Sequence, residues 1–369
     1  MTERFRPTVV GVDLDAIRHN VRTLHPAGSE LMAIVKADGY GHGAVPVARA
    51  AAEAGATWLG VALVEEGLEL RLAGLEVPIL VLSEFPRGSE RVALAHRLTP
   101  VVYTPEGVEA VAAAAPGVGV HVKVDTGMHR LGVWPPEDAA AFCDMVVDAG
   151  LQVEGLMTHL ARSEDDEATT TQQLERFRAA VEAVRAAGHE PTLVHAANSG
   201  GVIRHPESHL DLVRPGISLY GLEPEPGVGS HLDLRPALRW TSAVASARRM
   251  PAGAKVSYGH RYELGEEAWV ATVPVGYADG YPRPLSNLAD VLIGGTRRRV
   301  IGSVTMDQLI VLCGQDEVAP GDEVVLIGRQ GDEEVTAWEL ARHLGTVAWE
   351  IVTRIGPRVP REYGSGSGA

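Results

Sequence analysis

One lysine, Lys36, stands where an apolar run meets a glycine-rich segment. The run Leu31–Val35 predicts a β-strand, and the segment that follows, residues 37–43, reads ADGYGHG. An amine at a strand end, beside backbone that can bend around a bound group, suits a Schiff base with a carbonyl compound. An ordinary surface lysine before a loop is the alternative, and this stretch alone does not separate the two.

Polar or ionisable groups also follow four other predicted strands. They are found at residues 123–127, 158–159, 198–201 and 214–216. Parallel strands of an eight-stranded barrel end at one face, and the active sites of such enzymes lie at that face. The five strand ends together therefore predict a single site.

The last two of these strand ends suit a phosphate group. Asn198-Ser199-Gly200-Gly201 offers a hydroxyl and backbone amides, and Gly216 offers an amide with no side chain in the way. Barrels often bind phosphate in the loops after strands seven and eight, at the start of a short helix. A pair of tight turns is the alternative. A phosphate site combined with Lys36 indicates pyridoxal 5'-phosphate, with its aldehyde at the lysine.

Arg214 would have a distinct effect on such a cofactor. An arginine keeps its proton at working pH, so a pyridine nitrogen beside it would stay essentially unprotonated. The ring would then be a weaker electron sink, which favours immediate reprotonation of a carbanion over transamination. A salt bridge to Asp211 or to another acid is the alternative interpretation of Arg214.

The segment Val120–Asp125 alternates in character. Its valines form one face, and His121, Lys123 and Asp125 form the other. If the valines face the helices, Lys123 points into the barrel and needs an acid or a charge-reversing modification, because an unpaired buried charge is costly. His159 could be a satisfied core histidine, or it could bridge Arg214 and a catalytic base.

These residues need a scaffold that brings strand ends together. Between about residues 30 and 215, apolar strands alternate with alanine-rich helical segments. The predicted strands are Leu31–Val35, Trp58–Ala62, Ile79–Leu82, Leu98–Val102, Val118–Val124, Val153–Met157, Leu193–Ala196 and Leu210–Val213. The predicted helices include Ala44–Ala54, Val64–Leu72, Pro105–Ala115, Pro136–Asp148 and Thr169–Ala187. This alternation predicts an α/β fold, a parallel (β/α)8 barrel over residues 13–235.

After residue 235 the pattern becomes β-rich, which predicts a second domain of residues 1–12 and 236–369. The strand-like runs are Thr241–Arg249, Trp269–Val275, Asp290–Ile293, Val300–Ile301, Leu309–Leu312 and Glu323–Ile327, with a possible N-terminal strand at Thr8–Val12. One short helix, Thr336–Leu344, begins with a plausible Thr cap. The Pro- and Gly-rich stretch Glu223–Pro236 is the predicted linker.

Composition narrows the functional classes. A formal net charge of -15 over 369 residues argues against nucleic acid and anionic membranes as partners. Cys143 and Cys313 are far apart and have no metal-ligand neighbours, so idle thiols in a reducing compartment and no metal site are expected. The N-terminus has no signal-peptide core and no run is long enough to cross a membrane, so a cytoplasmic enzyme is expected. The tail Gly364–Ala369 is predicted to be flexible.

Nine motifs make the chain resemble the alanine racemase family, which uses pyridoxal 5'-phosphate. They are AIVKADGYGHG (33–43), HVKVDTGMHRLG (121–132), GLMTHLA (155–161), HAANSGG (195–201), RPGISLYG (214–221), SYG (257–259), VGYADGYPR (275–283), MDQ (306–308) and RVPR (358–361). They span nearly the whole chain in the family order. The resemblance implies an eight-stranded barrel, a C-terminal β domain and a homodimer with active sites shared between subunits.

The resemblance also implies residue roles. Lys36 would hold the cofactor as an aldimine and act as base on one face of the substrate Cα, and Tyr258 of the other subunit would act on the opposite face. His159 and Arg214 would form a hydrogen-bond chain that tunes the tyrosine. The implied phosphate contacts are Tyr40, Ser199, Gly216 and Ile217.

For the substrate, the resemblance implies that Arg130 and the backbone of Met306 hold the carboxylate. Lys123 would be carbamylated and orient Arg130, and Tyr277 would narrow the approach to the pocket. Two positions depart from the family pattern. Pro357 replaces a phosphate-contacting tyrosine, and Ser303 replaces an arginine near the approach.

The implied reaction is the interconversion of L-alanine and D-alanine by two bases, which supplies D-alanine for peptidoglycan. A racemase of serine or another small amino acid is an alternative. A barrel-type decarboxylase is another, although it would be expected to place a carboxylate by the pyridine nitrogen and a reactive cysteine at the site. A non-catalytic pyridoxal-phosphate carrier would resemble the barrel alone, so residues 237–369 argue against it.

Overall fold

The structure, a computed structural model, describes residues 5–364, and the chain divides into two units. The barrel unit contains Ala16–Gly39 and Gly43–Pro236. The β unit contains the residues up to Asp15, the short segment Tyr40–His42, and the residues from Ala237 onward. The sequence predicts a domain boundary between residues 235 and 236, and the two units meet along the chain between residues 236 and 237.

Short, apolar strands form the centre of the barrel unit, as expected when both faces of a parallel sheet are covered. All strand pairs in this unit are parallel. They form two sheets with the orders β10-β2-β3-β4-β5 and β6-β7-β8-β9. Their bounds are β2 Glu30–Ile34, β3 Trp58–Val61, β4 Ile79–Val81, β5 Leu98–Thr99, β6 Val101–Val102, β7 Gly119–Lys123, β8 Gln152–Met157, β9 Leu193–His195 and β10 Leu212–Val213.

The two sheets together follow the strand order of an eight-stranded barrel. Pro100 splits the predicted strand Leu98–Val102 into β5 and β6, because proline has no N–H to donate. The Pro100 carbonyl still accepts a hydrogen bond from the His121 amide at 2.9 Å. At the other seam, between β9 and β10, the amides of Asp211 and Arg214 donate to the carbonyls of Val194 and Ala197 at 3.1 and 2.9 Å. Backbone hydrogen bonds thus bridge both seams, although no continuous ladder joins the sheets there.

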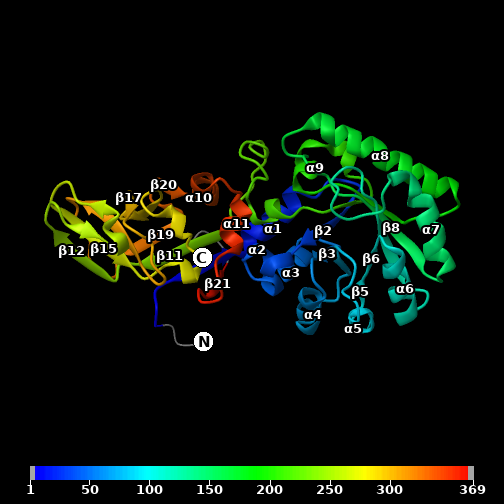
Figure 1. The fold of residues 1–369 in the computed structure, drawn as a ribbon, viewed down its shortest axis with the longest axis horizontal. Coiled ribbons are helices and arrows are strands. Elements are labelled where there is room, and N and C mark those ends of the chain that lie inside the picture. The colour runs from blue at the N-terminus through cyan, green and yellow to red at the C-terminus, as the bar shows by residue number, and fades with distance from the viewer. Residues whose placement is uncertain (1–4, 365–369) are drawn as a thin grey trace. The chain divides into compact units, whose positions relative to one another are not determined.

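Helices lie outside these strands (Figure 1). Their bounds are α3 Ala44–Glu53, α4 Val64–Leu72, α5 Glu90–Ala95, α6 Pro105–Ala114, α7 Ala139–Asp148, α8 Glu167–Ala186 and α9 Ser199–Arg204, and α1 (Leu14–Thr23) precedes β2. The valines of β7 pack with Phe142 of α7 and Leu174 of α8 in one buried cluster. The prediction that they face the helices is therefore confirmed, and Lys123 and His121 belong to the inner face.

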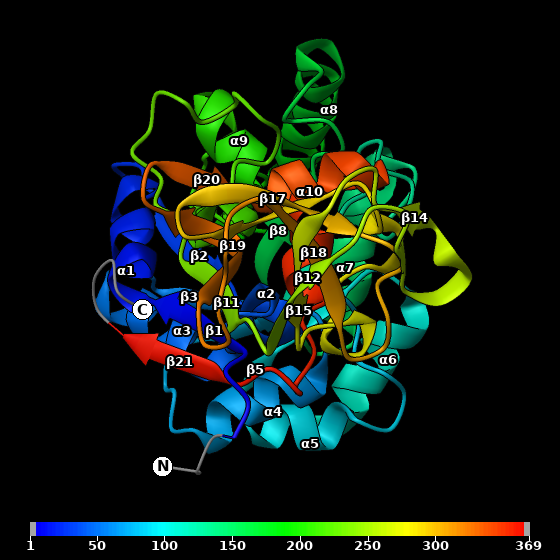
Figure 2. The same cartoon turned by 90° about the vertical axis from the view of Figure 1, so that its left-hand side faces the viewer.

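The β unit is built around a ten-stranded sheet with the order β12-β15-β18-β17-β16-β19-β11-β1-β21, and β20 pairs with β19. β1 lies between β11, to which it is antiparallel, and β21, to which it is parallel (Figure 2). A separate hairpin joins β13 and β14. The bounds are β1 Val9–Asp13, β11 Leu238–Ala243, β12 Ser246–Met250, β13 Lys255–Val256, β14 Tyr262–Glu263, β15 Ala268–Val273, β16 Asp290–Ile293, β17 Thr296–Ile301, β18 Leu309–Gly314, β19 Glu323–Gln330, β20 Glu333–Val335 and β21 Arg361–Gly364.

Three sequence expectations for this unit need correction. The predicted strand Thr241–Arg249 is two strands, because β11 pairs with β19 whereas β12 pairs with β15. Gly364, expected in a flexible tail, is paired with Asp13 at the end of β21, and the rest of that tail lies outside the described residues. A second helix, α11 (Ala348–Thr353), follows the predicted one and is too short to show a periodicity.

The predicted cap of the first helix is confirmed. Thr336 precedes α10 (Ala337–Leu344), and its hydroxyl accepts a hydrogen bond from the Glu339 amide at 3.0 Å. No helix in the described part of the chain is both long and apolar enough to cross a membrane.

Tyr220 connects the segment that follows Gly216 and Ile217 to the strand that precedes Lys36. Its fully buried hydroxyl donates to the carbonyl of Ile34, the last residue of β2, at 2.9 Å. We expect Tyr220→Phe to lower the free energy of unfolding by about 1–2 kcal/mol, because a buried carbonyl loses a donor. Urea denaturation measures this. Tyr262→Phe is the control, since no partner of the Tyr262 hydroxyl is found among residues 5–364, and equal stability of both variants would contradict the role of Tyr220.

Candidate active site

Lys36 begins a left-handed turn. Ala37, Asp38 and Tyr40 have φ angles of 53°, 52° and 50°, and Gly39 between them has φ 58°. A left-handed conformation costs non-glycine residues roughly 1–2 kcal/mol each, so a run of three is a substantial local strain. Strain of this kind persists only where the surroundings enforce it, and it concentrates at functional sites.

Glu66 helps to hold this turn in place. One of its carboxylate oxygens accepts from the Ala37 amide at 2.7 Å, and the other accepts from the amides of Ala62 and Leu63 at 2.8 and 3.1 Å. The carboxylate therefore joins the turn after β2 to the loop after β3 through charge-assisted bonds. Sequence reasoning missed Glu66, because it lies 30 positions from Lys36 in an ordinary helical pattern.

Positive groups gather around Lys36. Burial lowers the pKa of Lys36, the charge of Arg130 lowers it further, and Glu66 opposes both effects. Burial, followed by the charge of Arg214, lowers the pKa of Lys123 to about 8. Burial and the same cations hold the pKa of His159 well below its ordinary value, so this histidine is neutral. The cluster makes the Lys36 amine more readily available as a nucleophile and favours an anionic ligand.

Lys123 has no carboxylate partner in the described residues. Its ammonium donates only to the Leu82 carbonyl, at 3.4 Å. Asp125, the nearest acid in sequence, accepts instead from the amides of Gly127 and His129 at 2.9 and 3.0 Å. A shallow pocket borders Lys123, Asp125, Arg130 and His159. The charge problem raised by the sequence is therefore real, and the carbamylation of Lys123 stays a prediction.

Arg214 is buried and pairs with neutral groups. It donates to His195 Nδ1 at 2.8 Å and to the carbonyls of Thr158 and Ala196 at 2.6 and 3.0 Å. No acid within residues 5–364 forms an ion pair with it, and Asp211 instead accepts from the Val194 amide. The hydrogen-bond chain expected between His159 and Arg214 stays a prediction, because the donors of Arg214 found within residues 5–364 go to His195 and to the carbonyls of Thr158 and Ala196.

The hydrogen bonds of Arg214 fix the tautomers of two buried histidines. An arginine can only donate, so His195 Nδ1 accepts and its Nε2 carries the proton. That nitrogen lies 2.8 Å from His121 Nδ1, which must then accept. Burial lowers the pKa of His121 to about 3, so both rings are neutral links in a directed chain. Burial lowers the pKa of Arg214 itself to about 9, which leaves it protonated at neutral pH.

The two predicted phosphate loops meet at Ser199. Its hydroxyl accepts from the amides of Gly216 and Ser218 at 2.9 and 3.3 Å. Ser218 adds a buried hydroxyl that has no partner within the described residues. Asn198 is a helix cap, because its side-chain oxygen accepts from the Gly201 amide at 3.0 Å and from the Ser163 hydroxyl at 2.6 Å. Hydroxyls and amides converging from two loops, with one hydroxyl unsatisfied, fit a phosphate group, and Ile217 lies within this segment.

Tyr40 is the last residue of the left-handed turn. It is partly buried, and burial raises the pKa of its phenol to about 12, so the hydroxyl stays protonated. A protonated phenol is a hydrogen-bond donor, which suits the phosphate contact expected of Tyr40.

Tyr258 is held by two serines of the β unit. Ser257 has φ 61°, and its hydroxyl donates to the Ser303 carbonyl at 2.6 Å. The Ser303 hydroxyl donates back to the Tyr258 carbonyl at 2.9 Å. The backbone of Tyr258 is thus fixed while its side chain is 76% exposed. Ser303, the departure from the family pattern, is a buried link that orients Tyr258.

Tyr277 and Met306 lie on two adjacent loops of the same unit. The Tyr277 amide donates to the Thr305 carbonyl and the Ala278 amide to the Met306 carbonyl, both at 3.0 Å. Both side chains are largely exposed, at 42% and 53%. The structure therefore brings Tyr277 and Met306 together, as it brings together Lys36, Lys123, Arg130, His159 and Arg214 in the barrel unit.

The thiols of Cys143 and Cys313 are buried and unreactive. Cys143 and Cys313 are free and buried, and burial raises their pKa values to about 12 and about 11. Neither has the thiolate character of a reactive cysteine. Within the described residues, no group of three or more His, Cys, Asp or Glu side chains could hold a metal ion.

The fold and the Lys36 site define an α/β-barrel enzyme with an added β-rich domain, and comparison with known proteins identifies its family. The profile described as "Alanine racemase, N-terminal domain" matches residues 12–224, and "Alanine racemase, C-terminal domain" matches residues 237–363. The chain belongs to the alanine racemase family, which is pyridoxal 5'-phosphate-dependent. The predicted family, fold class, cofactor and racemase class are thereby confirmed.

Individual relatives cover almost all of the chain. Alanine racemase from Symbiobacterium thermophilum is 49% identical over 97% of each chain. The crystal structure of alanine racemase from D-cycloserine-producing Streptomyces lavendulae has a TM-score of 0.92 and 41% identity, covering 99% of both chains. That of alanine racemase from Bacillus anthracis with bound L-Ala-P has a TM-score of 0.93 and 37% identity, covering 98% of this chain and 96% of the other.

The charges around Lys36 predict two opposite shifts in its pKa. Arg130→Gln removes a like charge and should raise the Lys36 pKa, whereas Glu66→Gln removes an opposite charge and should lower it. The measurement is the pH dependence of Lys36 modification by an amine-specific reagent, followed by mass spectrometry of its peptide. Arg204→Gln, an exposed substitution outside the cluster, serves as the control. Shifts in the same direction for both site variants would contradict the assignment.

Proposed function

We propose that the protein interconverts L-alanine and D-alanine by a two-base mechanism with pyridoxal 5'-phosphate. The observation that carries the proposal is a half-buried Lys36 amine, with its pKa lowered, at a strand end of an alanine racemase barrel. The names of the relatives support alanine as the substrate. Serine or another small amino acid is the alternative, since a methyl and a hydroxymethyl group differ little in a pocket.

The residues that would hold the cofactor are Lys36 at one end and Tyr40, Ser199, Gly216 and Ile217 around the phosphate. When bound, the cofactor supplies an aldehyde that couples to amines and a ring that accepts electrons from the substrate Cα. The Ser199 hydroxyl, which accepts from the Gly216 and Ser218 amides, and the Ser218 hydroxyl, which has no partner within the described residues, can donate to a phosphate. Arg214, which is protonated at neutral pH, would be the partner of the ring nitrogen, where it would limit electron withdrawal and favour return of a proton to Cα.

Arg130 and the backbone of Met306 would bind the substrate carboxylate. Arg130 borders the same pocket as Lys123 and His159, and no acid in the described part of the chain forms an ion pair with it, so its guanidinium is available for a bidentate contact. Carbamylation of Lys123 would convert a buried cation into an anion that orients Arg130. Tyr277 would narrow the approach to the pocket.

The two proton carriers would be Lys36 and Tyr258 on opposite faces of Cα. We propose that Tyr258 comes from a second copy of the chain, so the active unit is a homodimer. Its exposure of 76%, combined with a rigid backbone between two serines, suits a side chain that acts in a neighbouring subunit. A cytoplasmic location and the supply of D-alanine for peptidoglycan stay predictions.

The first test addresses cofactor and substrate together. The purified protein with added pyridoxal 5'-phosphate should absorb visible light. Reduction with borohydride should attach the cofactor covalently to Lys36 as a label, which peptide mass spectrometry detects. Incubation with L-alanine should yield D-alanine, with less product from L-serine. Label elsewhere would refute the role of Lys36, and carbon dioxide release in place of D-alanine would favour the decarboxylase.

The second test addresses Tyr258. In Tyr258→Phe, kcat for racemisation should fall by about 10²- to 10⁴-fold, because one proton carrier is removed while cofactor binding is retained. Tyr262→Phe, which removes a nearby hydroxyl, should remain close to normal activity. Unchanged racemisation in Tyr258→Phe would refute the two-base role.

Mixing inactive variants tests the shared site. Dimers formed from Lys36→Ala and Tyr258→Phe chains carry one intact site in each mixed pair, so random mixing should restore about a quarter of wild-type activity. No recovery after verified subunit exchange would contradict a site built from two copies.

A further inference from the structure

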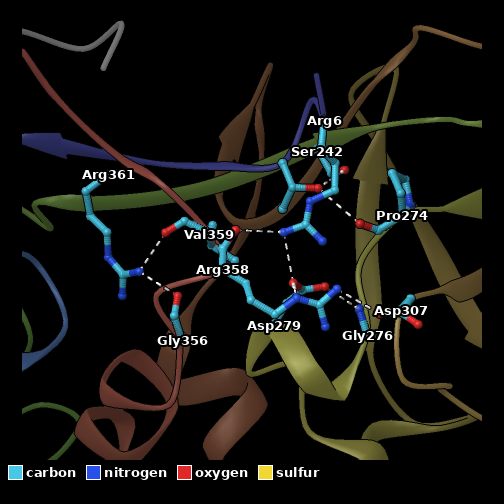
Figure 3. Close-up of polar contacts among 11 residues, drawn as sticks. Arg6, Ser242, Pro274, Gly276, Asp279, Asp307, Gly356, Arg358, Val359 and Arg361 are labelled. Atoms are coloured by element: carbon cyan, nitrogen blue, oxygen red, sulfur yellow. Dashed lines mark hydrogen bonds and ion pairs between the residues drawn. The ribbon is translucent and has the colours of Figure 1, made fainter. Parts of the chain in front are cut away.

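The carboxylate of Asp279 is completely buried in the β unit and is paired with charges from both ends of the chain. Arg6 forms an ion pair with it at 2.9 Å, and Arg358 Nε approaches the same oxygen at 3.6 Å (Figure 3). The other carboxylate oxygen accepts from the Gly276 amide at 3.0 Å. A buried carboxylate without such partners would be costly, so these contacts hold Asp279 in place.

Arg358 extends the network to a second acid. Its Nη2 donates to Asp307 at 2.8 Å, so one guanidinium lies between Asp279 and Asp307. Asp279 is two residues from Tyr277, and Asp307 directly follows Met306. The arginine therefore spans the two loops on which these side chains lie.

The loops are also in direct backbone contact. A Cβ atom on Gly276 would lie 2.3 Å from the carbonyl oxygens of both Thr305 and Met306, which no side chain could tolerate. The backbone bonds of Tyr277 and Ala278 cross the same gap. A shift in one loop must therefore move the other.

The N-terminal segment fixes the position of Arg6. Thr8 is buried, its hydroxyl lies 2.9 Å from that of Ser242, and it donates to the Pro274 carbonyl at 3.1 Å. Arg6 also donates to the Arg358 carbonyl at 3.0 Å. Figure 3 shows Arg6 and Arg358 converging on Asp279 from separate segments.

The second arginine of the same RVPR motif acts on a different segment. Arg361 Nε donates to the Gly41 carbonyl at 3.1 Å, next to Tyr40. Its Nη1 donates to the carbonyls of Gly356 and Val359, both at 2.7 Å. The motif thus connects the start of the β unit, its C-terminal strand and the loops of Tyr277 and Met306.

We propose that Arg6, Asp279, Arg358 and Asp307 are positioning residues that set the placement of the Met306 backbone and the Tyr277 ring for substrate binding. This inference rests on the proposed function of those two residues. It predicts an effect on KM more than on kcat, because the network reaches the groups that bind substrate and not the proton carriers. A purely structural role predicts a loss of stability without a larger effect on KM than on kcat.

The test substitutes Arg358, whose side chain is 46% exposed and can be changed without opening the core. Arg358→Gln should raise KM for alanine about five- to twentyfold and change kcat less than about threefold, because displaced loops weaken ground-state and transition-state binding alike. Arg358→Lys should give an intermediate KM, since an ammonium cannot bridge both acids as the fork does. Arg249→Gln breaks an exposed ion pair with Glu267 elsewhere in the β unit and should leave KM unchanged.

Asp307→Asn completes a double-mutant cycle. If Arg358 acts through Asp307, the fold increase in KM of the double variant should be smaller than the product of the fold increases of the two single variants. Independent, multiplicative effects would overturn the link through Asp307.

Hydrogen exchange gives a readout that does not depend on activity. Peptides covering residues 275–283 and 303–310 should exchange faster in Arg358→Gln than in the wild type, and not in Arg249→Gln. Unchanged exchange and unchanged KM would overturn the positioning role. A wild-type protein without racemase activity, combined with faster exchange in Arg358→Gln, would refute the proposed function while supporting the ionic connection between the loops.

Discussion

Burial of positive charge at the strand ends of the barrel is the constraint on which the site depends. Lys36, Lys123 and Arg214 lose solvation, Arg214 and Arg130 repel Lys123, and Arg130 repels Lys36, where the Glu66 carboxylate counteracts it. The site therefore has an excess of positive charge, which makes binding of an anionic cofactor or substrate favourable there. Burial and the charge of Arg214 keep His159 neutral, and burial and the charge of Arg130 lower the pKa of the Lys36 amine.

In the β unit, in contrast to the barrel unit, the buried charge of Asp279 is paired with opposite charges. There the buried carboxylate of Asp279 is matched by two arginines, and the result is rigidity in the loops of Tyr277 and Met306. Tyr258 is fixed by neutral hydrogen bonds through Ser257 and Ser303. Rigid backbones under exposed side chains give those side chains a defined direction, which suits recognition of a small substrate.

Much of the scaffold could be predicted because its signals are local. The alternation of apolar strands with helices located the barrel, and the period of two in β7 placed Lys123 and His121 on the inner face. Predictions failed where a local pattern was compatible with two outcomes. The run Thr241–Arg249 looks like one strand, and only its pairing with both β19 and β15 divides it. The Arg214–His195 bond was missed for a similar reason, since His159 and His195 lie close to the ends of neighbouring strands.

The sequence by itself determined the kinds of chemistry present: a lysine at a strand end, hydroxyls and amides for a phosphate, and motifs that define the family. Only the tertiary structure decided which groups act on one another. Glu66 reaches Ala37 across 29 positions, and Arg6 meets Arg358 across 352. Such pairs depend on distances and burial that arise only when remote segments pack, and the strengths of charge and hydrogen-bond interactions depend on that environment and not on neighbours along the chain.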